Sequence, residues 1–324
     1  MAGKIRQNWF FLVLALIFIL TVLDFPKVFS SVGQFLKNHH GPDIVIILIF
    51  FFSGLTLDSG KIFSGMKEYN SILIALGIIF IAAPCFAILF SLLSIDAEIL
   101  TGLFLVSAMP TTLSSGIVMT GKAGGNIVNA LMITIISGII AVFTVPVTLE
   151  LLLMLTGNAS DISIDTFRVI FKIGVFVLLP LFIGIGVRYN AKTFFQKHEK
   201  VFSLFNQWFV LSIIWMAASQ ARVIILDNSG KLPLIVALVF GYHAVLTGFA
   251  YLMTRVFKLR PGKRESVIFM GGQKTLPLAI MLQISFFPQY PVVLVVCVLH
   301  HAVHLMMDSF IAGKMERDKL AVRY

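Results

Sequence analysis

Charged residues are scarce in this chain of 324 residues, because Asp, Glu, Lys and Arg together account for only 12% of it. A soluble domain contains about 25% charged residues, so this composition excludes an ordinary soluble protein. Cysteine is also rare: Cys85 and Cys297 both lie within apolar runs, which excludes a disulfide-stabilised secreted domain. Hydrophobic residues make up 58% of the chain. We therefore predict an all-α polytopic membrane protein.

Long apolar runs are what the sequence has in abundance. Most of them approach the roughly 20 residues with which a helix crosses a bilayer. Ten such runs cover residues 9–23, 43–57, 71–93, 99–120, 126–155, 167–187, 201–218, 232–254, 266–286 and 291–312. We therefore predict ten transmembrane helices embedded in the lipid bilayer.

The formal net charge of +10 is distributed unevenly between the two sides of the predicted membrane. If the amino terminus is inside, 18 of the 25 Lys and Arg residues fall in inside loops, six fall in outside loops, and Lys274 falls within a span. Cytoplasmic loops are enriched in Lys and Arg. The pattern predicts a bacterial inner (plasma) membrane protein with both termini in the cytoplasm and no nucleic-acid partner.

The ten predicted spans divide into two sets of five near residues 156–165. Residues 1–160 form the first predicted five-helix repeat and residues 161–324 the second, within one integral membrane domain. Because each repeat has an odd number of helices, the second enters the membrane upside down relative to the first. The predicted fold is therefore two inverted five-helix repeats.

The fourth and ninth predicted spans carry interruptions at matching positions. The fourth contains Pro110 followed by a cluster of hydroxyl side chains, at Thr111, Thr112, Ser114 and Ser115. The ninth contains two glycines followed by Gln273, Lys274, Thr275 and Pro277. An unpaired backbone group costs several kcal/mol in hydrocarbon, so such breaks persist only where they are buried or line a wet cavity. Paired breaks of this kind hold the substrate and coupling ions in transporters built from repeats.

Lys274 is the residue most strongly expected to have a function. An ammonium group in mid-span costs about 2.5–3.5 kcal/mol on insertion scales, so it is expected to face the bundle interior or a wet cavity. A buried lysine changes its proton affinity readily, and it could carry a proton or bind an anion. The alternative is a structural cation, neutralised by helix carbonyls or by an acid elsewhere.

Oxygen atoms gather around the first break, from the hydroxyl groups beside Pro110 and from Asn126 and Thr134 farther along the chain. Hard cations such as sodium prefer several oxygen ligands, which hydroxyls, amides and freed carbonyls provide. A cluster that binds substrate or an ion is therefore predicted here. The alternative for any single hydroxyl is ordinary hydrogen bonding between neighbouring helices.

The last predicted span carries His300, His301, His304 and Asp308. Three of these recur at four-residue steps, so His300, His304 and Asp308 share one helix face. The spacing imitates the H-E-x-x-H zinc motif, but His301 stands where the catalytic glutamate would be. Without that carboxylate, hydrolysis has no evident proton acceptor, and we predict neither catalytic residues nor an enzyme. A proton relay, a partner for Lys274 and simple packing remain open.

Four stretches together resemble the bile acid:sodium symporter family (BASS), specifically its SBF-like branch. They are residues 51–57 (FFSGLTL), 109–115 (MPTTLSS), 124–126 (GGN) and 273–278 (QKTLPL). The resemblance extends over nearly the whole chain. It implies a panel made from the first two helices of each repeat and a core made from the other three. It also implies that helices 4 and 9 are discontinuous and cross, and that solute moves by alternating access.

The resemblance also implies sodium sites, and this sequence departs from them. Ser115 and Thr134 match hydroxyl ligands of the family's first sodium site, and Gln273 matches a shared glutamine. The asparagine that follows this glutamine in the family is Lys274 here, and the third-helix glutamine of the second site aligns with Ile79. The resemblance therefore leaves Ser115, Thr134 and Gln273 as positions for at most one sodium ion, and a lysine ammonium can take the place of a bound cation.

The predicted function is a secondary active transporter for a small organic solute, expected to be anionic because of Lys274. No cofactor is predicted beyond sodium or a proton as the coupling ion. The alternatives are a membrane sensor that binds a ligand without moving it, and an intramembrane metallohydrolase on His300 and His304. The sequence does not determine the oligomeric state.

Overall fold

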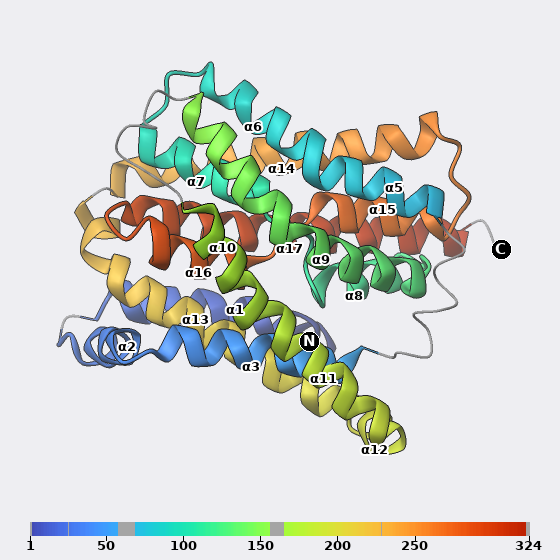
Figure 1. Ribbon diagram of the computed structural model, residues 1–324, viewed down its shortest axis with the longest axis horizontal. Helices are drawn as coiled ribbons and strands as arrows, with labels where there is room; N and C mark the ends of the chain where they lie inside the picture. The colour runs from blue at the N-terminus through green and yellow to red at the C-terminus, as the bar shows by residue number, and fades with distance from the viewer. Residues whose placement is uncertain (1, 25, 58–68, 156–164, 228, 322–324) are drawn as a thin grey trace.

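A computed structural model describes residues 2–24, 26–57, 69–155, 165–227 and 229–321, and these residues form helices and connections with no β-strand (Figure 1). In chain order the helices are α1 (Ala2–Val22), α2 (Val28–Asn38), α3 (Gly41–Thr56), α5 (Tyr69–Gly77), η2 (Ile78–Ala82), α6 (Ala83–Ser91), α7 (Ala97–Ala108), α8 (Ser115–Lys122), α9 (Ile127–Met154), α10 (Thr166–Ile173), η4 (Gly174–Leu178), α11 (Leu179–Asn190), α12 (Lys192–Lys197), α13 (Glu199–Asp227), η5 (Ser229–Lys231), α14 (Leu232–Val256), α15 (Lys263–Gly272), α16 (Leu276–Phe286) and α17 (Pro291–Ala321).

The helices are apolar enough for a membrane. Within the described residues, seven helices are long and hydrophobic enough to cross a bilayer, or up to eight if the bent pair α2 and α3 counts as one span. Two shorter apolar helices, at Leu12–Val22 and Ala97–Ala108, fall below that length. Each of the ten predicted apolar segments overlaps a helix or a helix pair. The predicted boundary between repeats, near residues 156–165, lies almost entirely outside the described residues.

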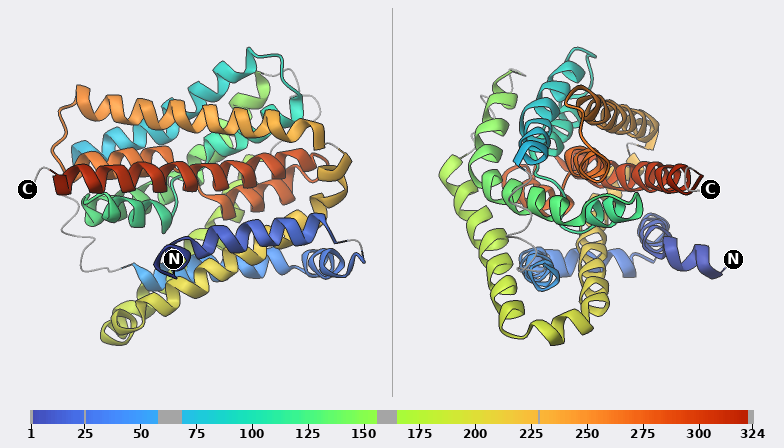
Figure 2. Two further views of the ribbon diagram at one scale, coloured as in Figure 1. Left: turned by 180° about the vertical axis from the view of Figure 1, so that it is seen from behind. Right: turned by 90° about the vertical axis from the view of Figure 1, so that its right-hand side faces the viewer.

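The helices form two layers (Figures 1 and 2). One layer, which we call the panel, contains α1, α2, α3, α11, α12 and α13. The other, the core layer, contains α5 to α9 and α14 to α17, including both interrupted spans. The continuous segment Thr166–Asn190 runs diagonally from the core layer into the panel (Figure 1). Helices α13 and α16 contact the opposite layer, so the space between panel and core lies beside the interrupted spans.

Helix α2 was not predicted, because the sequence between the first two spans is too short and too polar to read as a span. It meets α3 at an angle of 78°. Asp24 stabilises the first turn of α2, because Asp24 Oδ2 accepts hydrogen bonds from the backbone N–H of Ser30 (2.6 Å) and from the Ser30 hydroxyl (2.7 Å). The hydrogen bond from the backbone N–H of Ser30 contributes most to lowering the pKa of Asp24, and the bond from the Ser30 hydroxyl lowers it further.

Two glycines set the spacing of the panel helices α3 and α11. A Cβ atom on Gly54 would overlap the carbonyl oxygen of Leu181, and one on Gly184 would overlap the carbonyl oxygen of Phe51. Small residues at helix crossings in membranes let the two backbones approach closely. The panel therefore depends on the absence of side chains at these two positions.

Replacing Gly184 with leucine is expected to separate α3 from α11 and to destabilise the protein by about 1–3 kcal/mol or more, because the added side chain has no room. Thermal unfolding in detergent measures the loss. Gly186→Leu is the matched control on the same helix, since a Cβ there meets nothing within 4 Å. Equal stability of the two variants would contradict this account of the crossing.

Candidate functional site

The two interrupted spans meet at their breaks. Helix α7 ends at Ala108 and α8 begins at Ser115, while α15 ends at Gly272 and α16 begins at Leu276. The backbone N–H of Thr275 donates a 3.0 Å hydrogen bond to the carbonyl oxygen of Pro110, which joins one break to the other. Proline lacks an N–H and stops the first half-helix, and Pro277 starts α16 in the first-turn position that proline favours.

Lys274 lies inside this crossing and is only 2% exposed. Its Nζ donates three hydrogen bonds, to the carbonyl oxygens of Ile79 (2.8 Å), Ser107 (2.8 Å) and Met109 (2.9 Å). Ser107 and Met109 mark the carboxyl end of α7, and Ile79 lies in the π-helical turn η2; both kinds of site free carbonyl oxygens from the helical ladder. The ammonium therefore uses all three of its donors on backbone carbonyl groups, two at the negative carboxyl end of α7 and one in the π-helical turn within a continuous span.

Gln273 connects the first break to α17. Its Oε1 accepts hydrogen bonds from the hydroxyls of Thr112 and Ser115, both at 2.7 Å. Its Nε2 donates to Asp308 Oδ2 at 2.7 Å. The other carboxylate oxygen of Asp308, Oδ1, lies 3.0 Å from His243 Nε2. A continuous hydrogen-bonded chain thus runs from the break after α7 through Gln273 to a buried Asp–His pair.

The histidines of α17 lie as the spacing predicts. The rings of His300 and His304 are 5.3 Å apart, and His304 Nδ1 is 4.0 Å from Asp308 Oδ2. His301 Nδ1 and His304 Nε2 are 2.9 Å apart, within hydrogen-bond distance. Among the described residues, no group of three or more His, Cys, Asp or Glu side chains is arranged to hold a metal ion.

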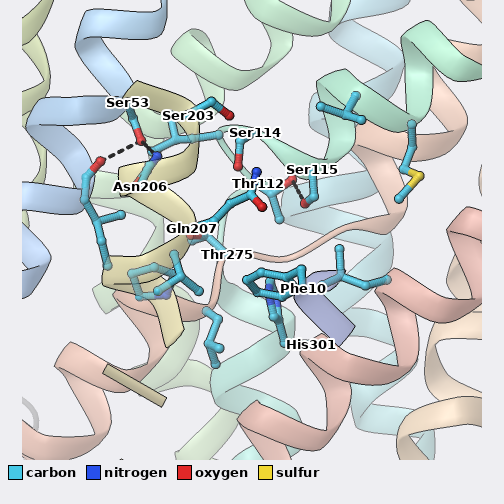
Figure 3. A pocket seen from close by; sticks show the side chains of 18 of the residues that line it. Phe10, Ser53, Thr112, Ser114, Ser115, Ser203, Asn206, Gln207, Thr275 and His301 are labelled. Carbon is cyan, nitrogen blue, oxygen red and sulfur yellow. Dashed lines mark hydrogen bonds between the residues drawn. The ribbon is translucent and has the colours of Figure 1, made fainter. Parts of the chain in front are cut away.

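A cavity of about 260 Å³ lies between the panel and the core layer (Figure 3). Polar side chains line both walls. The panel contributes Ser53, Ser203, Asn206 and Gln207, and the core layer contributes Thr112, Ser114, Ser115, Thr275 and His301. Small-molecule sites typically measure about 300–1,000 Å³, so this central cavity suits a small solute.

Two helix ends place partial charges beside the central cavity. Among the described residues that line it, none is Asp, Glu, Lys or Arg. The first residues of α8 and α16 do line it, and their N-cap residues, Ser114 and Thr275, make no side-chain cap to their own helices. A helix amino terminus carries a partial positive charge, which favours an anion, and at α8 the Gly116 N–H is already bonded to Thr112 Oγ1 at 3.0 Å. Two such ends converge on one cavity.

The predicted site residues therefore divide into four groups. Thr112, Ser114, Ser115, Thr275 and His301 line the central cavity. Gln273, Lys274, His300, His304 and Asp308 are buried and do not line it. Pro110, Thr111 and Thr134 line a separate void of about 20 Å³ that also touches Thr275. Asn126 lies away from both, because its Oδ1 caps α9 by accepting from the backbone N–H groups of Val128 and Asn129.

The oxygens at the three positions that match sodium ligands are engaged within the protein. The Ser115 hydroxyl donates to Gln273 Oε1 (2.7 Å), and the Thr134 hydroxyl donates to the carbonyl oxygen of Ala130 (3.0 Å). Gln273 Oε1 already accepts two hydroxyl donors. A sodium ion at these residues therefore stays a prediction from the resemblance.

Sequence reasoning missed the polar wall of the panel and the partner of Asp308. Asn206 donates through Nδ2 to the Ser53 hydroxyl at 2.8 Å, which joins α13 to α3 beside the cavity. His243 is fully buried in α14. The sequence did contain a signal for these residues, because each is a polar side chain within an apolar span. Polar residues inside membrane helices commonly face a pathway.

Known families and proteins resemble this chain over most of its length. Residues 8–317 match the model of the SBF-like CPA transporter family (DUF4137). The chain is 30% identical over 280 residues to a protein of Arabidopsis thaliana named "Probable sodium/metabolite cotransporter BASS4, chloroplastic", covering 82% of this chain and 64% of that protein. It is 24% identical over 321 residues to sodium/bile acid cotransporter 7 of Gallus gallus, covering 95% of this chain and 90% of that protein.

The rice protein of the BASS4 name, from Oryza sativa subsp. indica, is 27% identical over 284 residues, which are 82% of this chain and 66% of the rice protein. The chain thus spans just under two thirds of the length of its BASS4 relatives. The family match covers nearly the whole chain. The chain therefore belongs to the SBF-like CPA transporter family, a family of secondary transporters and not of enzymes.

Proposed function

We propose that this protein is a secondary active transporter that moves a small organic anion by alternating access through the central cavity. This proposal rests on one observation: the amino termini of the half-helices α8 and α16 converge on a cavity between the two helix layers. In transporters of this design, half-helix amino termini face the anionic group of the substrate. The hydroxyl of Ser114, which lines the cavity, supplies a hydrogen-bond donor beside those termini.

The proposal includes ten spans in two inverted five-helix repeats, residues 1–160 and 161–324. The broken pair α7 and α8 then corresponds to the broken pair α15 and α16, as the fourth span of each repeat. The panel of α1, α3, α11 and α13 corresponds to the first two spans of each repeat. The hydrogen bonds that join the two breaks support a fixed crossing about which panel and core layer move relative to each other.

Coupling is proposed to use a proton in place of sodium, although relatives of this chain carry sodium cotransporter names. The Lys274 ammonium is ligated by three carbonyl oxygens, as a bound cation would be. One of them belongs to Ile79, the position that aligns with a ligand of the second sodium site in the resemblance. A tethered ammonium at this position fulfils the structural role of the ion without a need for binding and release.

The protein is proposed to lie in a bacterial inner membrane with both termini in the cytoplasm. Beyond Trp9, Ser203 and Gln207, the central cavity continues into a groove lined by Gln196, Lys197, Glu199 and Lys200. These lysines belong to the predicted inside loops, so the arrangement corresponds to an inward-open state. Positive charge at such an entrance would also attract anions from solution.

Ligand-induced thermal stabilisation and counterflow test this function together. Small carboxylates and sulfonates are expected to raise the unfolding temperature of the purified protein, whereas matched neutral amides are not. In proteoliposomes preloaded with an anion that stabilises the protein, the same radiolabelled anion is expected to accumulate transiently. Stabilisation without counterflow would instead identify a sensor that binds its ligand and does not move it. Preference for neutral amides would contradict the anionic substrate.

A further inference from the structure

A buried carboxylate stands at the end of the hydrogen-bonded chain that begins in the central cavity. Asp308 is 1% exposed, and its two oxygens contact Gln273 Nε2 at 2.7 Å and His243 Nε2 at 3.0 Å. Through Gln273 the same chain reaches the hydroxyls of Thr112 and Ser115, which line the cavity. No part of the proposed substrate pathway accounts for a carboxylate at this depth.

We propose that Asp308, paired with His243, binds the coupling proton, and that Gln273 transmits its protonation state to the hydroxyls of Thr112 and Ser115 in the cavity. This inference rests on the proposed transport of an anion. It assigns both the proton site and the mechanism by which the proton and the solute affect each other's binding.

With Asp308 ionised, the orientation of the Gln273 amide is fixed. A carboxylate only accepts, so the Gln273 amide must present its N–H to Asp308 and its Oε1 to the other side. Oε1 then accepts from Thr112 and Ser115, as observed. Both hydroxyl hydrogens are then used within the protein, and the Thr112 oxygen also accepts the Gly116 N–H at 3.0 Å, so neither hydroxyl donates to an anion.

Protonation of Asp308 on Oδ2 reverses this orientation. A carboxylic acid donates its O–H, which requires an acceptor, so the Gln273 amide turns over and presents Oε1 to Asp308. Its NH₂ group now donates to the oxygens of Thr112 and Ser115. Their hydroxyl hydrogens are released toward the cavity, where they can donate to an anion. Proton binding therefore strengthens anion binding, and by linkage anion binding strengthens proton binding.

The surroundings of Asp308 make it suitable for exchanging a proton. An uncompensated charge buried in an apolar bundle is costly. The ion pairs of Asp308 within the described residues are with His243 of α14 and His304 of its own helix. Other titratable groups near this pair are Tyr242 on α14, Lys274 at the crossing, and His300 and His301 on α17. His243 Nδ1 has no hydrogen-bond partner in the structure, so a charged imidazole there is incompletely compensated.

The proton has a route from the cavity. His301 lines the cavity, and its Nδ1 is 2.9 Å from His304 Nε2. His304 Nδ1 also lacks a hydrogen-bond partner and lies 4.0 Å from Asp308 Oδ2. A proton can therefore pass from cavity water through His301 to His304, and it reaches Asp308 when the last two groups close to hydrogen-bond distance.

Infrared difference spectroscopy tests the proton site without any transported solute. Wild-type protein taken from neutral to acidic buffer is expected to gain the carbonyl band of a protonated carboxyl group. Asp308→Asn is expected to lose the component of this band that comes from one buried carboxyl group, and Gln273→Leu and Asp96→Asn are expected to retain that component. Asp96 is a matched control because it pairs with Lys231 outside the spans. Persistence of the full band in Asp308→Asn would overturn the proton site.

Binding of benzenesulfonate tests whether Gln273 transmits the protonation state of Asp308 to the cavity. The charge of this anion does not change between neutral and acidic pH. Its affinity for the wild type, measured by thermal shift or calorimetry, is expected to rise by about 5–150-fold in total as the pH falls, the usual range of coupling between two sites. Gln273→Leu is expected to bind the sulfonate with an affinity that no longer depends on pH. A wild-type affinity that is independent of pH, or an unchanged dependence in Gln273→Leu, would overturn the transmission. If no anion binds at any pH, the proposed function fails, and the infrared band still decides the role of Asp308.

Discussion

Replacing Lys274 with alanine is expected to lower the stability of the protein severely and to make the remaining stability depend on sodium. The substitution leaves the carbonyl oxygens of Ile79, Ser107 and Met109 without their shared donor. A buried polar group left unpaired costs about 1–3 kcal/mol, and three are affected at once. All three point at one vacated position, which is the arrangement that binds a metal cation at helix ends.

Thermal unfolding in sodium chloride and in choline chloride at equal ionic strength measures this effect. Sodium is expected to raise the unfolding temperature of Lys274→Ala and to leave that of the wild type unchanged. Lys274→Met is the matched control, because its side chain fills the vacated volume while supplying no donor. It is expected to be destabilised without rescue by sodium. Anion uptake in proteoliposomes is expected to be lost in both variants and regained with sodium only in Lys274→Ala.

A sodium response in the wild type, or the absence of one in Lys274→Ala, would contradict the assignment of the ammonium as a tethered cation. The distinction matters for function. If the ammonium replaces sodium at this position, a sodium ion bound here cannot drive the transporter, and the coupling ion must bind elsewhere, as we propose for a proton at Asp308.

The helical segments and their interruptions were predictable from the sequence because they depend on local properties. Apolar runs located the helices, and Pro110 and the glycine pair before Gln273 located the breaks. The four-residue spacing of His300, His304 and Asp308 likewise sufficed to place them on one face of α17. Each of these inferences needs only the geometry of one helix.

Contacts between distant segments were not predictable from one sequence. The partners of Lys274 are backbone carbonyls, which every residue possesses, so no residue type marked Ile79 or Met109 as ligands. The expectation of an anionic solute was based on Lys274, yet the ammonium is bonded to carbonyls and does not line the central cavity. The structural support for an anion comes instead from the amino ends of α8 and α16, whose convergence depends on tertiary packing.

A cysteine placed at Ser203 is expected to be modified faster by a membrane-impermeant thiol reagent from the cytoplasmic side than from the outside. Ser203 lines both the central cavity and the groove that leads to Lys197 and Lys200, so a water-soluble reagent can reach it from that end. Attachment of a charged adduct within a cavity of about 260 Å³ leaves little room for a solute. Anion counterflow is therefore expected to be abolished by the modification.

The measurement uses the Cys85→Ala background, because Cys85 is exposed whereas Cys297 is buried. Labelling is followed by mass spectrometry in right-side-out and inside-out vesicles, so the result does not depend on a transport assay. Ser137→Cys, at a fully buried position on α9, is expected to remain unmodified from either side. Labelling of Ser203→Cys from the outside alone would reverse the proposed orientation of the termini. Labelling of Ser203→Cys at equal rates from both sides would contradict an inward-open resting state, whereas slower labelling from the outside is what the outward-open phase of alternating access produces.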